Sequence, residues 1–347
     1  MWRDWSSPAL HCLGIVFPNA DNAFPHRSRC ACAPGHGPGQ PPSQDGGTGP
    51  VELCPSEEID PGLAEQEERS IEVTILHSAE RANLLRYDLS DGLIYAEVLV
   101  NGQAVRGIFD TGADSTYVDT GLIERLGGSL TGPRSRGHTG LNTFDVSRAC
   151  ETTFTIPGQI TLTGDLPATD LSGLSERLGR QAGVIIGRNL LGQMTWVVNP
   201  KDNLGILALG TMTFNGGVPD SVAVEERRIE ATVNGMPATL LFDTGFNGTL
   251  ALRAERWDDY VPAGAEIGTQ RAADGTGAVY EKRATSGVSL SVGGVTVDAE
   301  ASEGKLAQEG VDGLLGYGFF RNATIIHVPT EGILYFSMRK DESADAD

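Results

Sequence analysis

Short apolar runs, rather than a helical period, dominate the chain. Between about residue 70 and residue 336 these runs alternate with polar residues and end at turns rich in Gly, Asn and Asp. Runs of about four to eight residues with a period of two are typical of strands that bury one face. The 45 glycines fit a chain with many turns. The pattern therefore predicts an all-β protein, mainly antiparallel, with a few short helices.

The first set of runs predicts strands at 71–75, 93–100 and 105–109. Asn101-Gly102 separates the last two, and Asn-Gly is the strongest short hairpin signal because both positions tolerate a positive φ. A later apolar run, 184–187, has the composition of a buried strand that ends at Gly. Short helices are expected at 122–126, 171–178 and 188–193.

The same plan returns in the second half of the chain. Expected strands at 229–233 and 238–242 flank Asn234-Gly235, and an apolar-apolar-Gly run at 314–316 answers the one at 185–187. We therefore expect two lobes of like topology. The expected domains are a disordered tail (1–68), a first lobe (69–212), a second lobe (213–338) and an acidic tail (339–347).

One four-residue sequence anchors this repeat. Phe109-Asp110-Thr111-Gly112 returns as Phe242-Asp243-Thr244-Gly245, and Val-Asn-Gly stands at the same distance before each copy. Glu97 and Glu230 match upstream, and Thr116 and Thr249 match downstream. No gap is needed to align the two stretches. The repeat indicates an internal duplication that places one carboxylate at the end of an apolar strand in each lobe.

Composition excludes several classes of function. The net charge of −20 argues against a nucleic-acid partner, which would need clustered Lys and Arg. No apolar run reaches 18 residues, so no transmembrane segment is expected. The five cysteines are odd in number and form no Cys-x-x-Cys pair, which supports neither a disulfide framework nor a zinc site. Residues 10–17 make a poor signal peptide, and both a cytoplasmic and an exported location stay open.

The repeated motifs resemble the aspartic proteases, and within them the retropepsin-like enzymes of retroviruses and their bacterial relatives. Asp110-Thr111-Gly112-Ala113-Asp114 resembles the signature of that family, and the run from Ile185 to Leu191 resembles its partner motif. The second lobe is looser, with Phe246-Asn247 after its Asp-Thr-Gly. The resemblance covers residues 90–336 and implies a bilobal aspartic protease fold. Retroviral enzymes are homodimers, whereas two fused lobes imply a monomer.

This resemblance implies a catalytic pair, Asp110 and Asp243. Two carboxylates a few Å apart cannot both ionise cheaply, so they share one proton. The ionised member takes a proton from a water that attacks a peptide carbonyl, and the other protonates the carbonyl oxygen. No metal or cofactor is needed. In the family the threonines, here Thr111 and Thr244, lock the two loops together, while Gly112 and Gly245 let backbone amides approach the carboxylates.

The substrate implied is a peptide or protein bound as a β-strand. Two polar hairpins, near 137–140 and 274–277, are expected to close over it. The family also implies an ion pair between Asp114 and Arg188 beside the site. The matching second-lobe positions hold Asn247 and Tyr317, so the two halves of the cleft are expected to bind substrate differently. Substrate-binding positions are expected at Ala113, Asp114, Phe246, Asn247, Gly140 and Gly275.

A catalytically inactive, protease-derived peptide-binding module is the alternative. Phe246 is bulkier than the small residue usual after this Gly, and the second lobe lacks the ion pair. Both carboxylates and both threonines are nevertheless present. Other hydrolytic chemistries lack their motifs, because the chain has no Gly-x-Ser-x-Gly, no His-Glu-x-x-His and no phosphate-binding Gly-Lys loop. The sequence therefore favours an aspartic endopeptidase.

Overall fold

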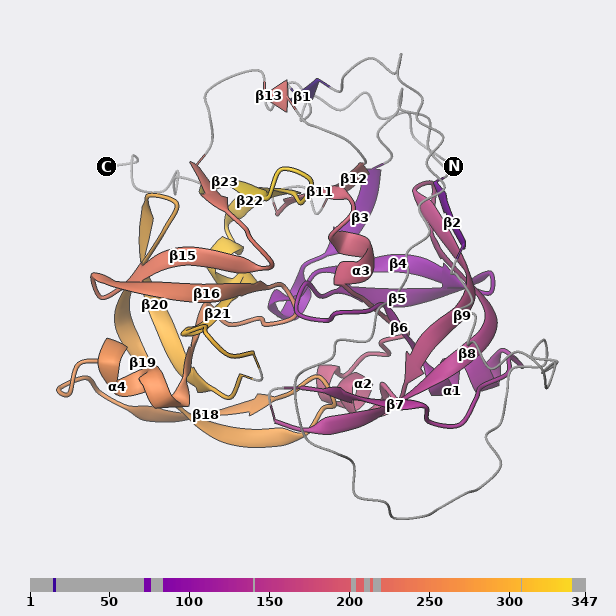
Figure 1. The fold of residues 1–347 in the computed structure, drawn as a ribbon, viewed down its shortest axis with the longest axis horizontal. Helices are drawn as coiled ribbons and strands as arrows, with labels where there is room; N and C mark the ends of the chain where they lie inside the picture. The colour runs from indigo at the N-terminus through magenta and orange to yellow at the C-terminus, as the bar shows by residue number, and fades with distance from the viewer. Residues whose placement is uncertain are drawn as a thin grey trace, which may run out of the picture.

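The chain is built from β-strands with a few short helices, as the sequence predicts (Figure 1). The computed structural model describes residues 15–16, 72–75, 84–139, 141–200, 204–208, 213–214, 220–306 and 308–338. Two halves lie side by side in Figure 1, the first drawn in indigo to magenta and the second in orange to yellow. A sheet made from both halves joins them.

The first half is organised around a central strand, β10 (Val184–Ile186), which lies beside the strand that leads to Asp110. β10 lies between β5, to which it is parallel, and β6, to which it is antiparallel. The long β8–β9 hairpin folds over β4 and carries β7 at its far end. The other elements of this half are β2 (Glu72–Ile75), β4 (Tyr95–Val100), β5 (Gln103–Phe109), β6 (Tyr117–Asp119), α1 (Thr120–Arg125), β7 (Ser135–His138), β8 (Thr143–Ile156), β9 (Ile160–Thr169), α2 (Ser172–Leu178) and α3 (Arg188–Leu191).

The second half has the same arrangement. β21 (Gly313–Gly316) lies between β16, parallel, and β17, antiparallel, and β15 pairs with β19 as β4 pairs with β8. Both Asn-Gly turns have positive φ, 48° at Asn101 and 50° at Asn234, as the hairpin prediction requires. The elements are β15 (Arg228–Val233), β16 (Met236–Asp243), β17 (Leu250–Arg253), α4 (Trp257–Tyr260), β18 (Gly268–Ala273), β19 (Val279–Val292) and β20 (Val295–Gly304).

Six strands join the halves, in the order β14-β23-β22-β11-β12-β3, and we call them the joining sheet. They are one end of a 14-stranded sheet that continues from β3 to β4 in the first half. β11 and β22 meet at its centre, where Val197 lies opposite Ile326. The two strands on either side of that pair correspond one to one, so this sheet shares the twofold pattern of the halves. Its strands are β3 (Leu84–Asp88), β11 (Thr195–Asn199), β12 (Leu204–Ala208), β14 (Asp220–Ala223), β22 (Ala323–Val328) and β23 (Ile333–Met338).

Aromatic side chains fill the space between this sheet and the repeated motif. Trp196 of β11 stacks on Phe242 of β16 with ring centres 6.3 Å apart, and Phe320 meets Phe242 edge-on at 5.7 Å. All three side chains are fully buried. Because Phe242 precedes Asp243, a first-half tryptophan helps to fix the strand that carries the second carboxylate. Truncating a buried aromatic of this kind costs about 3–5 kcal/mol.

Two features involve segments that the sequence assigned to tails or linkers. β1 (Ile15–Val16) pairs with β13 (Thr213–Phe214). Cys150, buried in β8, is disulfide-bonded, although we expected no disulfide from the odd cysteine count; its partner lies outside the described residues. Within the described ranges, no helix is long and apolar enough to cross a membrane.

Candidate active site

Asp110 and Asp243 are brought together by the ends of equivalent strands. Asp110 follows β5 directly, and Asp243 is the last residue of β16. A Cβ added to Gly112 would lie 2.5 Å from Asp243 Oδ1, and one added to Gly245 would lie 2.4 Å from Asp110 Oδ1. Each glycine therefore packs directly against the carboxylate of the opposite loop. Only a residue without a side chain permits this approach.

Thr111 and Thr244 lock the two loops through a reciprocal set of hydrogen bonds. The amide of Thr111 donates to Thr244 Oγ1 at 3.0 Å, and the amide of Thr244 donates to Thr111 Oγ1 at 3.0 Å. Each hydroxyl then donates across the seam, Thr111 to the carbonyl of Phe242 at 3.1 Å and Thr244 to that of Phe109 at 2.9 Å. Both side chains are buried. These four bonds hold the carboxylates in register.

The carboxylates share an environment that favours a single proton. Asp110 Oδ1 accepts from the amides of Gly112 at 2.8 Å and Ala113 at 3.1 Å, and Asp243 Oδ1 accepts from that of Gly245 at 2.9 Å. Burial, and then the charge of Asp243, raise the pKa of Asp110 to about 7. Burial also raises the pKa of Asp243. Two neighbouring carboxylates of raised pKa are suited to acid–base catalysis near neutrality.

Arg227 makes the pair asymmetric. Its Nη1 donates to the carbonyl of Gly112 at 2.9 Å, and its Nη2 donates to Gln308 Oε1 at 3.0 Å. After burial, the Arg227 charge is the largest influence on Asp243, and it lowers the pKa of that carboxyl. The backbone of Arg227 has a φ of 70°, which is uncommon for a residue with a side chain. A second-half cation thus holds the first-half loop and lies beside the second carboxylate.

Arg227 was not predicted from the sequence as a site residue. The carbonyl of Arg227 accepts from Phe242 as that of Ile94 accepts from Phe109, so Ile94 is the corresponding residue of the first half. Extending the gapless repeat upstream would have aligned the two. That alignment would have shown an arginine in the second half where the first half has an isoleucine, and so would have marked Arg227 as a candidate.

A cavity of about 720 Å³ opens beside Asp110, while Asp243 is not among its lining residues. Of the expected site residues, Asp110, Gly245, Phe246, Asn247 and Gly275 line it. Its first-half wall has five apolar side chains, Leu93, Ile108, Leu174, Leu178 and Ile185, and also carries the charged Asp91 and Arg177. Its second-half wall carries charged side chains, Arg271, Lys282, Glu300 and Arg321. The shape and position are those of a substrate cleft.

The two polar hairpins meet over this cleft. Asp274 Oδ2, from the β18–β19 turn, accepts from Thr139 Oγ1 at 2.8 Å and from Asn142 Nδ2 at 2.7 Å. A Cβ on Gly275 would lie 3.6 Å from the Thr139 methyl group. Gly140, expected in the first hairpin, lies outside the described residues. The hairpins that we expected to close over a substrate are thus joined by a single carboxylate.

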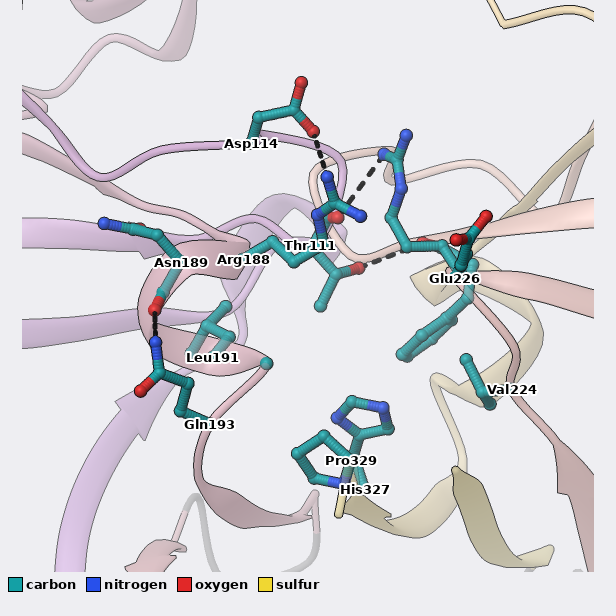
Figure 2. A pocket seen from close by; sticks show the side chains of 13 residues that line it. Thr111, Asp114, Arg188, Asn189, Leu191, Gln193, Val224, Glu226, His327 and Pro329 are labelled. Carbon is teal, nitrogen blue, oxygen red and sulfur yellow. Dashed lines mark hydrogen bonds and ion pairs between the residues drawn. The ribbon is translucent and has the colours of Figure 1, made fainter. Parts of the chain in front are cut away.

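Asp114 and Arg188 form an ion pair, with 2.8 Å between Asp114 Oδ1 and Arg188 Nη2. The Asp114 side chain is 71% exposed and that of Arg188 is 42% exposed, so the pair is not buried. Both line a second cavity, of about 400 Å³, rather than the larger one. Figure 2 shows Asp114 and Arg188 at one end of this smaller cavity, and His327 and Pro329 at the other. The structure thus separates the ion pair from the cleft.

The remaining expected residues have mainly backbone or cross-half contacts. The carbonyl of Ala113 accepts from the amide of Arg188 at 2.8 Å, and that of Phe246 accepts from Tyr317 at 2.9 Å. These equivalent bonds support the alignment of Arg188 with Tyr317. Asn247 Nδ2 donates to the carbonyl of Asp91 at 3.0 Å and so ties the second loop to the first half. Over the part of the chain that the structure describes, no group of three or more His, Cys, Asp and Glu side chains is placed to hold a metal ion.

Comparison with known proteins agrees with this geometry. Residues 96–190, which include Asp110 and the strand β10, match the sequence model described as aspartyl protease. No curated protein sequence matches the chain. Among solved structures, an aspartic proteinase from Irpex lacteus is similar at 13% identity and a TM-score of 0.49, covering 77% of this chain and 100% of its own. The expected resemblance to the aspartic proteases is confirmed over residues 96–190.

Proposed function

We propose that the protein is an aspartic-type endopeptidase that hydrolyses peptide bonds with a water activated between Asp110 and Asp243. The observation that carries this proposal is the mutual packing of each carboxylate against the glycine of the opposite loop, below a cleft of about 720 Å³. The raised pKa values of both carboxyls and the aspartyl protease match of residues 96–190 support it.

The two carboxylates have different roles in this mechanism. Asp243 is the ionised member and accepts the proton of the attacking water, because the charge of Arg227 favours its anionic form. Asp110 holds the shared proton and donates it to the carbonyl oxygen as that oxygen becomes tetrahedral. The amides of Gly112 and Ala113 keep Asp110 in place during the transfer. As the C–N bond breaks, the leaving amine takes the proton that Asp243 accepted, and Asp110 regains the proton it gave to the carbonyl oxygen, so no covalent intermediate is needed.

We also propose that the lobes, 69–212 and 213–338, arose by internal duplication of a retropepsin-like unit, between tails at 1–68 and 339–347. The equivalent placement of β10 and β21 and the twofold pattern of the joining sheet support this origin. Because one chain supplies both carboxylates, a monomer suffices for catalysis.

The proposed substrate is a peptide or protein segment bound in extended form beneath the hairpins. Asn247, Phe246 and Gly275 line the cleft, so they are proposed to contact substrate directly. Ala113 and Asp114 follow Asp110 in its loop and do not line the cleft with their side chains, so any contact that they make with substrate is proposed to be through their backbone. Opening of the Asp274 contacts would admit the peptide.

Cleavage of a proteome-derived peptide library, read by mass spectrometry between pH 3 and pH 8, tests the function. We expect defined cleavage sites and inhibition by a hydroxyl-bearing transition-state analogue. Binding of peptides without cleavage at any pH would instead support the inactive module, for which the bulky Phe246 in the cleft is the specific observation. Cleavage that a chelator abolishes and the analogue leaves unchanged would refute the carboxylate mechanism.

Arg227→Leu tests the assignment of roles. Removing the cation raises the pKa of Asp243, so the acid limb of the kcat/KM profile is expected to move to higher pH. The neighbouring Arg228→Leu, which removes an exposed cation paired with Glu226 at 3.4 Å, is the matched control and should leave the limb in place. If Arg227→Leu still cleaved peptides and its acid limb did not move, Asp243 would not be the ionised member of the pair.

A further inference from the structure

The walls of the cleft differ most at one pair of corresponding positions. Lys282 lies in β19 opposite Gln270 of β18, and Val146 lies in β8 opposite Ser135 of β7. Both are the fourth residue of their strands, which are of equal length. A lysine in the second half thus stands where the first half has a valine. Only the lysine lines the cleft.

Lys282 is held in the cleft by groups that leave its charge uncompensated. Its Nζ donates to Ser302 Oγ at 2.9 Å and lies 5.4 Å from the centre of the Phe246 ring. Among the described residues, no carboxylate oxygen lies within 4.0 Å of Lys282 Nζ, so the ammonium forms no ion pair with them. An ammonium has three donors, and the hydroxyl of Ser302 takes one of them. Two donors therefore remain for a ligand.

The nearest acid does not cancel this charge. Glu300 also lines the cleft, but its residue is exposed and its Oε1 accepts from Gln270 Nε2 at 2.8 Å. Burial lowers the pKa of Lys282, while Glu300 raises it. The effect of burial is larger than that of Glu300, so the Lys282 ammonium is partly desolvated. A partly desolvated cation with free donors gains most from an anionic partner.

The aromatic ring fixes where that partner would sit. Phe246 directly follows Gly245, which packs against Asp110, and Phe246 and Asp110 line the same cleft. Lys282 lies over the ring, and Ser302 is buried behind the ammonium. The side chain of a substrate residue flanking the scissile bond on this side would pack its methylenes on Phe246 and bring its end group to Nζ.

We propose that Lys282 is a specificity-determining residue, which selects a Glu or Asp side chain at the subsite formed by Phe246, Lys282 and Ser302. This inference rests on the proposed function and names the class of substrate. The first-half wall also carries Asp91 and Arg177, but Leu93, Ile108 and Ile185 form an apolar part of it. The preferred substrate therefore has an apolar residue on one side of the scissile bond and an acidic residue on the other.

A panel of peptides tests this subsite. The peptides share one cleaved sequence and differ only by Glu, Gln or Lys at each position flanking the bond. At one of these positions, kcat/KM for Glu is expected to exceed that for Gln by about tenfold, the effect of about one charge-assisted hydrogen bond. The preference should fade as the pH falls through about 4.3, where the substrate glutamate is protonated. No preference for Glu at any flanking position would overturn the proposal.

Lys282 variants identify the residue responsible. Lys282→Met should remove the Glu preference and Lys282→Glu should reverse it in favour of Lys. Lys305→Glu makes the same change in net charge at an exposed lysine that does not line the cleft, and should keep the preference. If the Lys282→Glu variant still cleaved the Glu peptide faster than the Lys peptide, the assignment of Lys282 as the selecting residue would be refuted.

A binding measurement separates this inference from the proposed function. The Asp243→Asn protein, with and without Lys282→Met, is titrated with the Glu and Gln peptides at pH 6; if the wild type cleaves nothing, the titrated pair comes from a library selected by binding. Tighter binding of the Glu peptide that Lys282→Met abolishes supports the subsite even if the wild type does not cleave. Equal binding of both peptides would count against the subsite even if cleavage is confirmed.

Discussion

Asp110→Asn and Asp243→Asn are each expected to lower kcat for peptide cleavage at least about 10³-fold, because each removes one of the two groups that move a proton in the same step. The substitution is nearly isosteric. Asn Oδ1 can still accept from the amides that hold Asp110 Oδ1 and Asp243 Oδ1 at 2.8–2.9 Å. The loops should therefore stay in place. Single-turnover kinetics on a peptide identified from the library measures the loss.

Thermal unfolding of the same variants controls for misfolding. Replacing one of two carboxylates that share a proton removes their mutual repulsion, so a melting temperature equal to or above that of the wild type is expected. Asp298→Asn changes an exposed aspartate of β20 and should leave kcat unaltered. Wild-type cleavage by either dyad variant would refute the pair as the catalytic centre.

Gly245→Ala is the second change with a large expected effect. Its Cβ would lie 2.4 Å from both Cγ and Oδ1 of Asp110, closer than atoms approach without bonding. The two loops must therefore move apart, which displaces the carboxylates from each other and strains the threonine contacts. A displacement of about 1 Å in a catalytic site costs about 10²-fold in rate. Overpacking of this kind also destabilises by about 1–3 kcal/mol.

The loss in Gly245→Ala is measured as kcat/KM together with the free energy of unfolding. Gly264→Ala is the matched control, since a Cβ at Gly264 meets nothing within 4 Å and its φ is not in the left-handed region. We expect that control to cleave like the wild type. If Gly245→Ala also retained full activity, the loops would not be in the contact that the structure shows.

Local signals in the sequence predicted much of the fold. The Asn-Gly turns determine the β4–β5 and β15–β16 hairpins because turn and strand periodicity agree within a few residues. The joining sheet was not predicted, because its central pair, β11 and β22, is far apart in sequence and no turn links them. Each of these strands is simply apolar, and apolarity does not specify a partner.

The site residues that are identical in the two copies of the repeat were predicted from the sequence. Asp110, Thr111 and Gly112 and their second-half counterparts are identical in both halves, so their meeting follows from the pairing of equivalent strands. The residues that make the halves differ were missed, because a search for likeness overlooks them. Arg227 matches Ile94, and Lys282 matches Val146. The placement of Asp114 and Arg188 at a separate cavity depended on packing that no motif encodes.

The pairing of β11 with β22 has a consequence for how the protein responds to dilution. The antiparallel pairs Trp196–His327, Val197–Ile326 and Val198–Ile325 join the two halves across the seam beneath the two carboxylates. The partners are tethered, so their effective concentration is set by the chain and not by the solution. Specific activity should therefore be the same at picomolar and micromolar protein. Loss of the catalytic centre then requires unfolding at the seam rather than dissociation.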